Sequence, residues 1–325
     1  MRRKRAETTI NREIAKIPEK TMKYFSVIIA ISVLIVVSAI STSAQSAPKF
    51  DSNRAWGHLQ QVVAIGPRPA GSPAIEQTRK YIKDQLAALG LKAVEQAWDD
   101  ETPLGRVHLV NLIVTIPGAS KDRVAITGHY DTKLFREFPF VGASDGGSST
   151  AFLIEFARVL KARRNRLTYD LIFLDGEEAV VEWRGKDNTY GSRHYVEAAK
   201  RDGSLKSLKA MILVDMIADR DLGIRRDSYS TPWLTDIIWN TAAGMKLSNY
   251  FLPAATTVED DHLPFLAAGV PSVDIIDLDY DAWHTRRDTL DAVSARSMQV
   301  VGDVVLASLP RIEQHVLTPS NRQNP

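Results

Sequence analysis

The chain contains no cysteine. It can therefore form no disulfide, and its stability has to come from its own hydrophobic core. Thiolate ligands are excluded as well, so any metal site must be built from histidine, aspartate and glutamate. An excess of charge is also lacking, because 41 Lys and Arg stand against 39 Asp and Glu. The resulting net charge of +2 indicates no strong electrostatic partner, and nucleic-acid binding is not expected.

Several sequence signatures are absent too. The chain has no HExxH helix and no G-x-S-x-G turn, which excludes two common hydrolase designs. It has no internal repeat and no low-complexity linker, which favours one folded domain from about residue 50 onward. With 325 residues, 44% of them hydrophobic, the chain has ample material for a sizeable core.

The first 47 residues have the layout of an export signal. A basic leader covers residues 1–23, the apolar run YFSVIIAISVLIVVSAI covers residues 24–40, and the small-residue segment STSAQSAP follows. This order is typical of a secretory signal, although the run is also long enough for a short membrane anchor. We therefore expect a signal peptide or anchor over residues 24–47 and an exported protein that is secreted, periplasmic or membrane-anchored facing outside. Either cleavage near Ala44 or membrane attachment through residues 24–40 is compatible with this pattern.

The rest of the chain alternates between short apolar strands and helical stretches. Strands are predicted at residues 110–116, 124–127, 171–174, 211–214 and 273–276, and helices at 54–65, 73–89, 150–163, 190–200, 231–243 and 294–309. Continuous apolar strands indicate a sheet covered on both faces. The prediction is an α/β fold: a single domain over residues 50–315 with a mixed, mostly parallel central sheet flanked by helices, followed by a polar tail over residues 316–325.

Polar residues follow three of these strands. GHYD (residues 128–131) ends one, DGEE (residues 175–178) ends another, and Asp215 ends a third. In open α/β sheets, ligands bind outside the carboxyl ends of the strands. The sequence therefore predicts a functional site at this edge of the sheet.

The residue types in and around these motifs suit a metal site. Glu177 and Glu178 are adjacent, and two buried carboxylates repel one another unless a cation is present. One of them can bind a metal while the other stays free as a base. Asp145 lies in a Gly/Ser-rich loop before a helix, and His284 lies in the segment AWHT. Zinc accepts such nitrogen and oxygen ligands while keeping one position open.

The ordered motifs GHYD, FVGASDGG, FLDGEEA, YGSRH, VDM, EDDHLPFLAAGVP and AWHT resemble those of the zinc aminopeptidase clan. Within it, the sequence is most similar to the animal-type glutaminyl-peptide cyclotransferases (glutaminyl cyclases). The resemblance spans residues 56–309. It implies a zinc-dependent conversion of N-terminal glutamine to pyroglutamate with release of ammonia, acting on peptide or protein N-termini that begin with glutamine. We also expect the protein to be a monomer.

The resemblance also implies residue roles. Asp145, Glu178 and His284 would bind one Zn²⁺. Glu177 would be the general acid and base, with Asp215 and Asp260 completing a carboxylate network. Trp183 and Trp283 would line the pocket for the glutamine side chain. The segment DLDYDAWHT departs from the family in its acidic residues (Asp277, Asp279 and Asp281), which is expected to change the pocket rim.

Two other functions remain open at this point. A zinc aminopeptidase would use the same fold, with His129 and Asp215 as additional ligands of a second metal and Asp145 as a bridge. Both residues are present, so the ligand set does not separate the two enzymes. An inactive binding module of the same fold is the third reading, but it would leave buried carboxylates without a cation.

Overall fold

The computed structural model describes residues 48–318. The predicted leader, the signal or anchor segment and nearly all of the predicted tail lie outside the described residues, so the division into these segments stays a prediction. Within residues 48–318, no helix combines the length and the hydrophobicity that crossing a membrane requires.

A six-stranded mixed sheet forms the centre of the domain. Its strands are β1 (Val94–Thr102), β2 (Gly105–Ile116), β3 (Arg123–His129), β4 (Thr168–Leu174), β5 (Leu208–Asp215) and β8 (Ser272–Ile276), in the spatial order β1-β2-β4-β3-β5-β8. Pairings β4–β3, β3–β5 and β5–β8 are parallel, whereas β1 and β2 form an antiparallel hairpin at one edge. The predicted mixed, mostly parallel sheet is confirmed.

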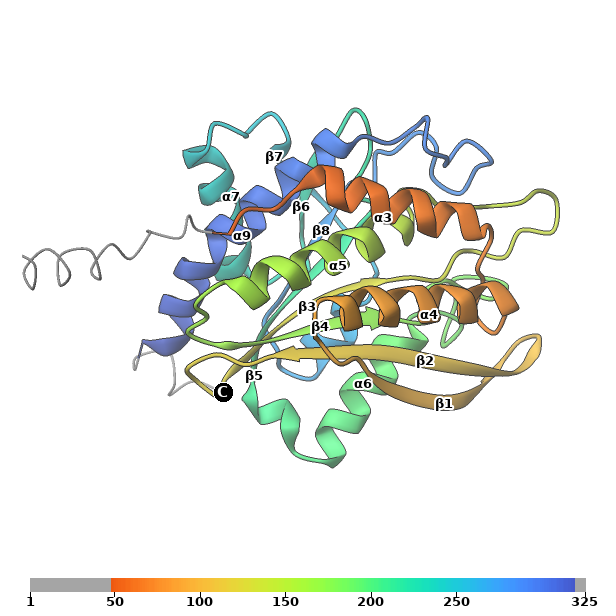
Figure 1. The fold of residues 1–325 in the computed structure, drawn as a ribbon, viewed down its shortest axis with the longest axis horizontal. Helices are drawn as coiled ribbons and strands as arrows, with labels where there is room; N and C mark the ends of the chain where they lie inside the picture. Colours follow the sequence, from red (N-terminus) through yellow and green to blue (C-terminus); the bar gives the residue numbers. More distant parts are fainter. Residues whose placement is uncertain (1–47, 319–325) are drawn as a thin grey trace, which may run out of the picture. The chain divides into compact units, whose positions relative to one another are not determined.

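Helices cover both faces of this sheet, as Figure 1 shows. On one side lie α3 (Ser52–Ile65), α4 (Pro73–Ala88), α5 (Gly147–Ala162) and α9 (Ala295–Leu317), with α7 (Pro232–Gly244) against α9. On the other side lie α6 (Tyr190–Arg201), a short 3-10 helix η1 (Ser204–Ser207) and α8 (His262–Ala267). A small second sheet pairs β6 (Ile224–Asp227) with β7 (Phe251–Thr256).

The alternating direction of side chains along each strand explains why the domain has a hydrophobic core on each face of the sheet. In β3, Val124 and Ile126 join the larger core with α3, α5 and α9, whereas Ala125 joins the smaller core with α6 and α8. Successive side chains of a strand point to opposite faces, so a continuous apolar run fills both cores. The domain is therefore held together without disulfides, as its lack of cysteine requires.

Helix ends follow the local sequence. The Asp51 side chain accepts hydrogen bonds from the N–H groups of Asn53 and Arg54 at the start of α3. Ser72 caps α4 in the same way, and Pro73 takes the first helical position, where its missing N–H costs nothing.

Tertiary packing extends some elements beyond their predicted limits. Helix α9 was expected to end at residue 309, before Pro310, but it continues to Leu317. The continuation buries Ile312 and Val316 in the larger core, and Glu313 pairs with Arg163. These contacts compensate for the hydrogen bond that proline cannot donate. Strands β1, β6 and β7 and helix α8 were not predicted, since each is short or largely exposed.

Candidate active site

Three neighbouring strands deliver acidic and imidazole side chains to one edge of the sheet. His129 is the last residue of β3, and Asp215 is the last residue of β5. Glu177 and Glu178 follow the end of β4. Since β3 pairs in parallel with both β4 and β5, the three strand ends meet at one edge, as the sequence predicted.

Two loops add the remaining candidate ligands. Asp145 lies just before α5, where Gly146 adopts a left-handed conformation with φ of 72°. A Cβ atom on Gly146 would lie 2.3 Å from the carbonyl oxygen of Asp131, so a glycine is required at this close approach. His284 comes from the loop that follows β8 and also has a positive φ, of 52°. Such backbone strain in a non-glycine residue is typical of functional sites.

Asp145, Glu178 and His284 form the first candidate metal site. Their ligand atoms all lie within 4.8 Å of one another. His284 Nε2 is 3.4 Å from Asp145 Oδ2 and 3.3 Å from Glu178 Oε1. The structure thus brings together the three residues that the resemblance implied as zinc ligands.

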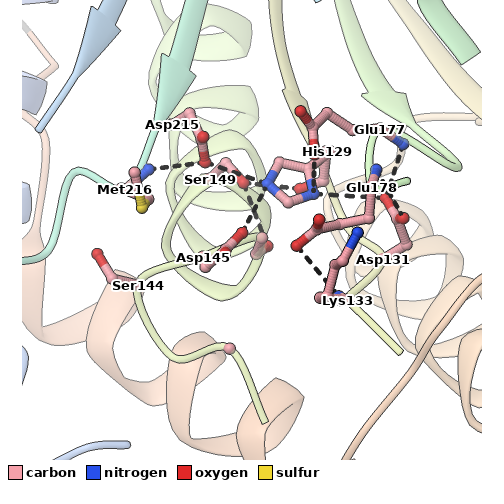
Figure 2. Close-up of polar contacts among 12 residues, drawn as sticks. His129, Asp131, Lys133, Ser144, Asp145, Ser149, Glu177, Glu178, Asp215 and Met216 are labelled. Atoms are coloured by element: carbon pink, nitrogen blue, oxygen red, sulfur yellow. Dashed lines mark hydrogen bonds and ion pairs between the residues drawn. The ribbon is translucent and has the colours of Figure 1, made fainter. Parts of the chain in front are cut away.

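His129, Asp145 and Asp215 form a second candidate site. His129 Nε2 lies 3.2 Å from Asp145 Oδ1 and 3.1 Å from Asp215 Oδ1. Figure 2 shows the His129 ring between these two carboxylates on one side and Glu177 and Asp131 on the other. Asp145 belongs to both sites and directs one oxygen to each, which is the geometry of a bridging ligand.

The first site has the chemistry that a divalent cation needs. Among the described residues, the buried Asp145 Oδ2 has no hydrogen-bond partner. Burial, together with the nearby Asp145 carboxylate, raises the pKa of Glu178 to about 7. A cation between these oxygens offsets both effects. One imidazole nitrogen and two carboxylates match the ligand set of a zinc site with an open position.

Glu177 is buried beside this site but belongs to neither donor set. Burial raises its pKa well above the ordinary range; the carboxylates of Asp260 and Glu178 add to this, against the opposing effect of His129. A buried carboxyl group next to an open metal position is suited to accept and return a proton.

Asp131 organises the glutamate pair, a role that the sequence did not reveal. Its carboxylate accepts hydrogen bonds from the N–H groups of Glu177 (3.2 Å) and Glu178 (3.3 Å). His129 Nδ1 lies 3.4 Å from Asp131 Oδ1. The available signal was the pattern His-Tyr-Asp, which places both side chains on one side of extended backbone.

Asp260 lies at the start of the segment that leads into α8. It is buried, and its Oδ2 atom has no hydrogen-bond partner within residues 48–318. Burial and the carboxylates of Asp215 and Asp261 raise its pKa well above the ordinary range. It faces the same cavity as Glu177 and Asp215.

This cavity has a volume of about 510 Å³ and is lined by both tryptophans that the resemblance implied. Trp283 stacks on His284 with ring centroids 4.5 Å apart, and 43% of its surface is exposed. The loop that carries Trp183 is held by Asp187, whose carboxylate accepts the N–H groups of Val180, Val181 and Glu182.

Two of the three acidic residues before Trp283, Asp277 and Asp279, do not have the expected position on the rim. Asp277 is buried and accepts the N–H of Gly223, and Asp279 pairs with Arg225 at 2.6 Å. The described lining of the cavity includes Leu278 between them. Their contacts with Gly223 and Arg225 hold the two carboxylates outside the described lining of the cavity.

Comparison with known proteins agrees with this geometry. The family model described as Peptidase family M28 matches residues 111–309. A mouse glutaminyl-peptide cyclotransferase-like protein is 32% identical over 272 residues, covering 74% of this chain and 70% of the mouse protein. The crystal structure of an Acidobacteriales bacterium glutaminyl cyclase superimposes with a TM-score of 0.80 at 40% identity, covering 85% of this chain and 99% of that chain. A leucine aminopeptidase precursor from Bacteroides thetaiotaomicron gives a TM-score of 0.75 at 26% identity, with coverage of 81% and 98%.

The fold is thus that of the α/β metallopeptidase class, and the histidine and carboxylate cluster is compatible with a metal. The chain belongs to peptidase family M28 and, within it, to the glutaminyl-peptide cyclotransferases. The relatives carry the names of enzymes, which argues against the inactive binding module.

Proposed function

We propose that this chain is a glutaminyl-peptide cyclotransferase, which converts the N-terminal glutamine of peptides to pyroglutamate and releases ammonia. The observation that carries the proposal is the arrangement of one cavity. Glu177 and the donor set of Asp145, Glu178 and His284 line it together with Trp183 and Trp283. Its volume of about 510 Å³ lies in the range of small-molecule sites and is large enough for an N-terminal glutamine residue.

In this proposal Asp145, Glu178 and His284 would hold a single Zn²⁺. The short distances from His284 Nε2 to both carboxylates support this assignment. When bound, zinc would supply Lewis-acid polarisation of the side-chain amide carbonyl.

The reaction is an intramolecular acyl transfer. The α-amine nitrogen of the substrate forms a bond to its own side-chain amide carbon, and the bond from that carbon to the amide nitrogen breaks. Glu177 accepts the proton that the attacking amine loses and returns it to the departing nitrogen, which leaves as ammonia. Because the nucleophile is already tethered, the pocket mainly has to hold the substrate in a folded conformer.

The other residues hold the substrate and control access of water. Asp260 and Asp215 line the cavity near Glu177, where a carboxylate can orient the substrate amine. Trp183 and Trp283 offer flat apolar surfaces to the glutamine side chain. Excluding water from the amide prevents hydrolysis from competing with ring closure.

The test is a mass measurement on peptides incubated with the purified enzyme. A peptide that begins with glutamine should lose the mass of ammonia with its length unchanged, and one that begins with leucine should be unaltered. A chelator should stop the reaction, and added zinc should restore it. Loss of one residue from the leucine peptide, with no ring closure on the glutamine peptide, would reject the proposal.

A two-metal aminopeptidase is the second candidate. It is favoured by one observation: the shared Asp145 links the first site to a second donor set with His129 and Asp215. There Glu177 would activate water against a peptide bond. Metal analysis separates the candidates, since about one zinc per chain supports the cyclase and about two support the peptidase.

We also propose that the enzyme acts outside the cytoplasm as a monomer. The basic and apolar order of residues 1–40 supports export. Gel filtration of the purified catalytic domain would test the monomer.

A further inference from the structure

Arg68 lies in the segment GPRPAGSP, to which the proposed reaction assigns no role. Its side chain is completely buried. The guanidinium donates hydrogen bonds to the backbone carbonyl oxygens of Tyr130 (2.9 Å), Val141 (2.5 Å), Gly142 (2.9 Å) and Asp145 (3.4 Å). One side chain therefore connects the end of β3 with the loop that carries Asp145.

The environment of Arg68 is unusual for a buried charge. The acceptors of the hydrogen bonds that its guanidinium donates are all backbone carbonyl oxygens rather than carboxylates. Burial lowers its pKa to about 10, against the opposing effect of the carboxylates of Asp145, Asp288 and Asp131. Burying a charge costs free energy unless its polar atoms are hydrogen-bonded. Here the guanidinium N–H groups are bonded to backbone carbonyl oxygens, which they hold in place.

Asp288 holds the same loop from the opposite direction. Its two carboxylate oxygens accept the N–H groups of Ser144 (2.8 Å) and Asp145 (3.1 Å), and one of them also accepts the Tyr280 hydroxyl (2.7 Å). Asp288 is buried and follows His284 by four positions. It thus joins the loop of one candidate metal ligand to the loop of another.

We infer that Arg68 and Asp288 are positioning residues that clamp the backbone of Asp145 and thereby set the geometry of the metal site. Arg68 fixes the carbonyl oxygen of Asp145, and Asp288 fixes its N–H. Fixing both groups holds the Cα of Asp145 in place, and in this position its side chain directs Oδ2 toward His284 and Oδ1 toward His129. This inference rests on the proposed function, because it assumes that Asp145 binds the metal.

Each residue type is suited to its task. Arginine presents several donors in a rigid planar fork and can reach carbonyls on two segments, whereas lysine has a single nitrogen at the end of a flexible stem. Aspartate offers two acceptor oxygens to two adjacent N–H groups. Asparagine of the same shape would direct an NH₂ group at one of them.

The experiment compares Arg68→Lys and Asp288→Asn with the parent and with Arg163→Lys. Arg163 is a matched control, because it is mostly buried and pairs with Glu313 at the opposite end of α5, about 24 Å from Asp145 along the helix. Zinc affinity is measured by competition with a chelator. Residues that orient metal ligands typically contribute 10–100-fold to affinity, so both site variants should bind zinc about 10–100-fold more weakly. The control should keep the parental affinity, whatever it loses in thermal stability.

A second measurement uses metal-free protein. Hydrogen exchange of the Ser144 and Asp145 amides should be faster in both site variants and unchanged in the control. With zinc at saturating concentration, the KM for a glutamine peptide should stay near the parental value while kcat falls. If one variant fails to fold, the other still tests whether holding the Asp145 backbone affects zinc binding, because Arg68 contacts its carbonyl oxygen and Asp288 its N–H.

Parental zinc affinity in both folded variants, with slow exchange at Asp145, would overturn the inference. Equal loss of zinc affinity in the Arg163 control would overturn it too, because the effect would then be general destabilisation. Failure of the proposed function has a different signature: the parent itself would bind no zinc or would not cyclise glutamine, while the exchange result would still report on the clamp.

Discussion

His284 Nε2 lies 3.4 Å from Asp145 Oδ2, although the two residues are 139 positions apart in the chain, in the loops before α5 and after β8. His284 is thus one of two imidazole groups that approach Asp145, since His129 Nε2 lies 3.2 Å from the other oxygen. The candidate site of Asp145, Glu178 and His284 depends on His284 for its imidazole ligand. A second metal, held by His129, Asp145 and Asp215, would depend on His129.

Replacing Glu177 with glutamine should leave zinc bound and lower kcat. Glu177 belongs to neither donor set, so only proton transfer is lost, which typically costs about 10²–10⁴-fold in rate. His284→Ala should lose zinc together with activity. Turnover of a glutamine peptide and metal content are measured on the same samples, with Glu101→Gln as control, because Glu101 is exposed and pairs with Arg106 outside the cavity. A Glu177→Gln enzyme as fast as the parent would show that another group carries the proton.

Trp183→Ala and Trp283→Ala should impair cyclisation while the zinc content stays near the parental value. Both side chains line the cavity, but neither offers a ligand atom to the metal. Truncation removes the flat surfaces that fix the glutamine side chain and exclude water. Steady-state kinetics and metal analysis check this, with Trp98→Ala as control, because Trp98 stacks on His194 outside the cavity. Full activity in both cavity variants would contradict the pocket assignment.

Glu313→Gln should destabilise the fold in a pH-dependent manner. Burial alone would raise the pKa of Glu313, but hydrogen bonds and charge from Arg163 outweigh it, with the Tyr169 hydroxyl adding to them, and the pKa is lowered. A carboxyl group with a lowered folded-state pKa contributes stability above its unfolded pKa and loses it as pH falls through the folded value. Breaking this largely buried pair should therefore cost about 3 kcal/mol at pH 7, and much less at an acid pH below the lowered folded-state pKa of Glu313.

Chemical denaturation at both pH values measures this difference. Asp84→Asn is the control, since the Lys80–Asp84 pair is exposed and should contribute little at either pH. A destabilisation of equal size at low pH would mean that the charge of the Glu313 carboxylate does not contribute to the free energy of unfolding.

Deleting residues 24–40 should retain the protein inside the cell, because the apolar segment is the proposed export signal. Cell fractionation with detection of the catalytic domain measures the distribution. A chain that starts at Met22 keeps the apolar segment and should still be exported. Undiminished export of the deletion variant would rule out the signal.

Much of the site could be predicted from the sequence because it is encoded locally. An apolar run such as residues 171–174 followed directly by acidic residues places those residues at the end of a strand, and parallel strands end at the same edge. The positions of Glu177, Glu178 and Asp215 at that edge therefore follow from pattern alone. The absence of cysteine likewise determined that imidazole and carboxylate groups would have to form any metal site.

Only the tertiary structure decided how residues far apart in the chain meet. Sequence pattern identified Asp145 and His284 as candidates, but the 3.4 Å contact between them depends on how two loops dock on the finished core. The same holds for Arg68, whose partners are backbone carbonyls and leave no signature in side-chain spacing. Helix α9 passes through Pro310 for a related reason: the apolar surface that it buries outweighs a local preference to stop. Local preferences act over a few residues, whereas contact between distant segments is determined by the packing of the whole core.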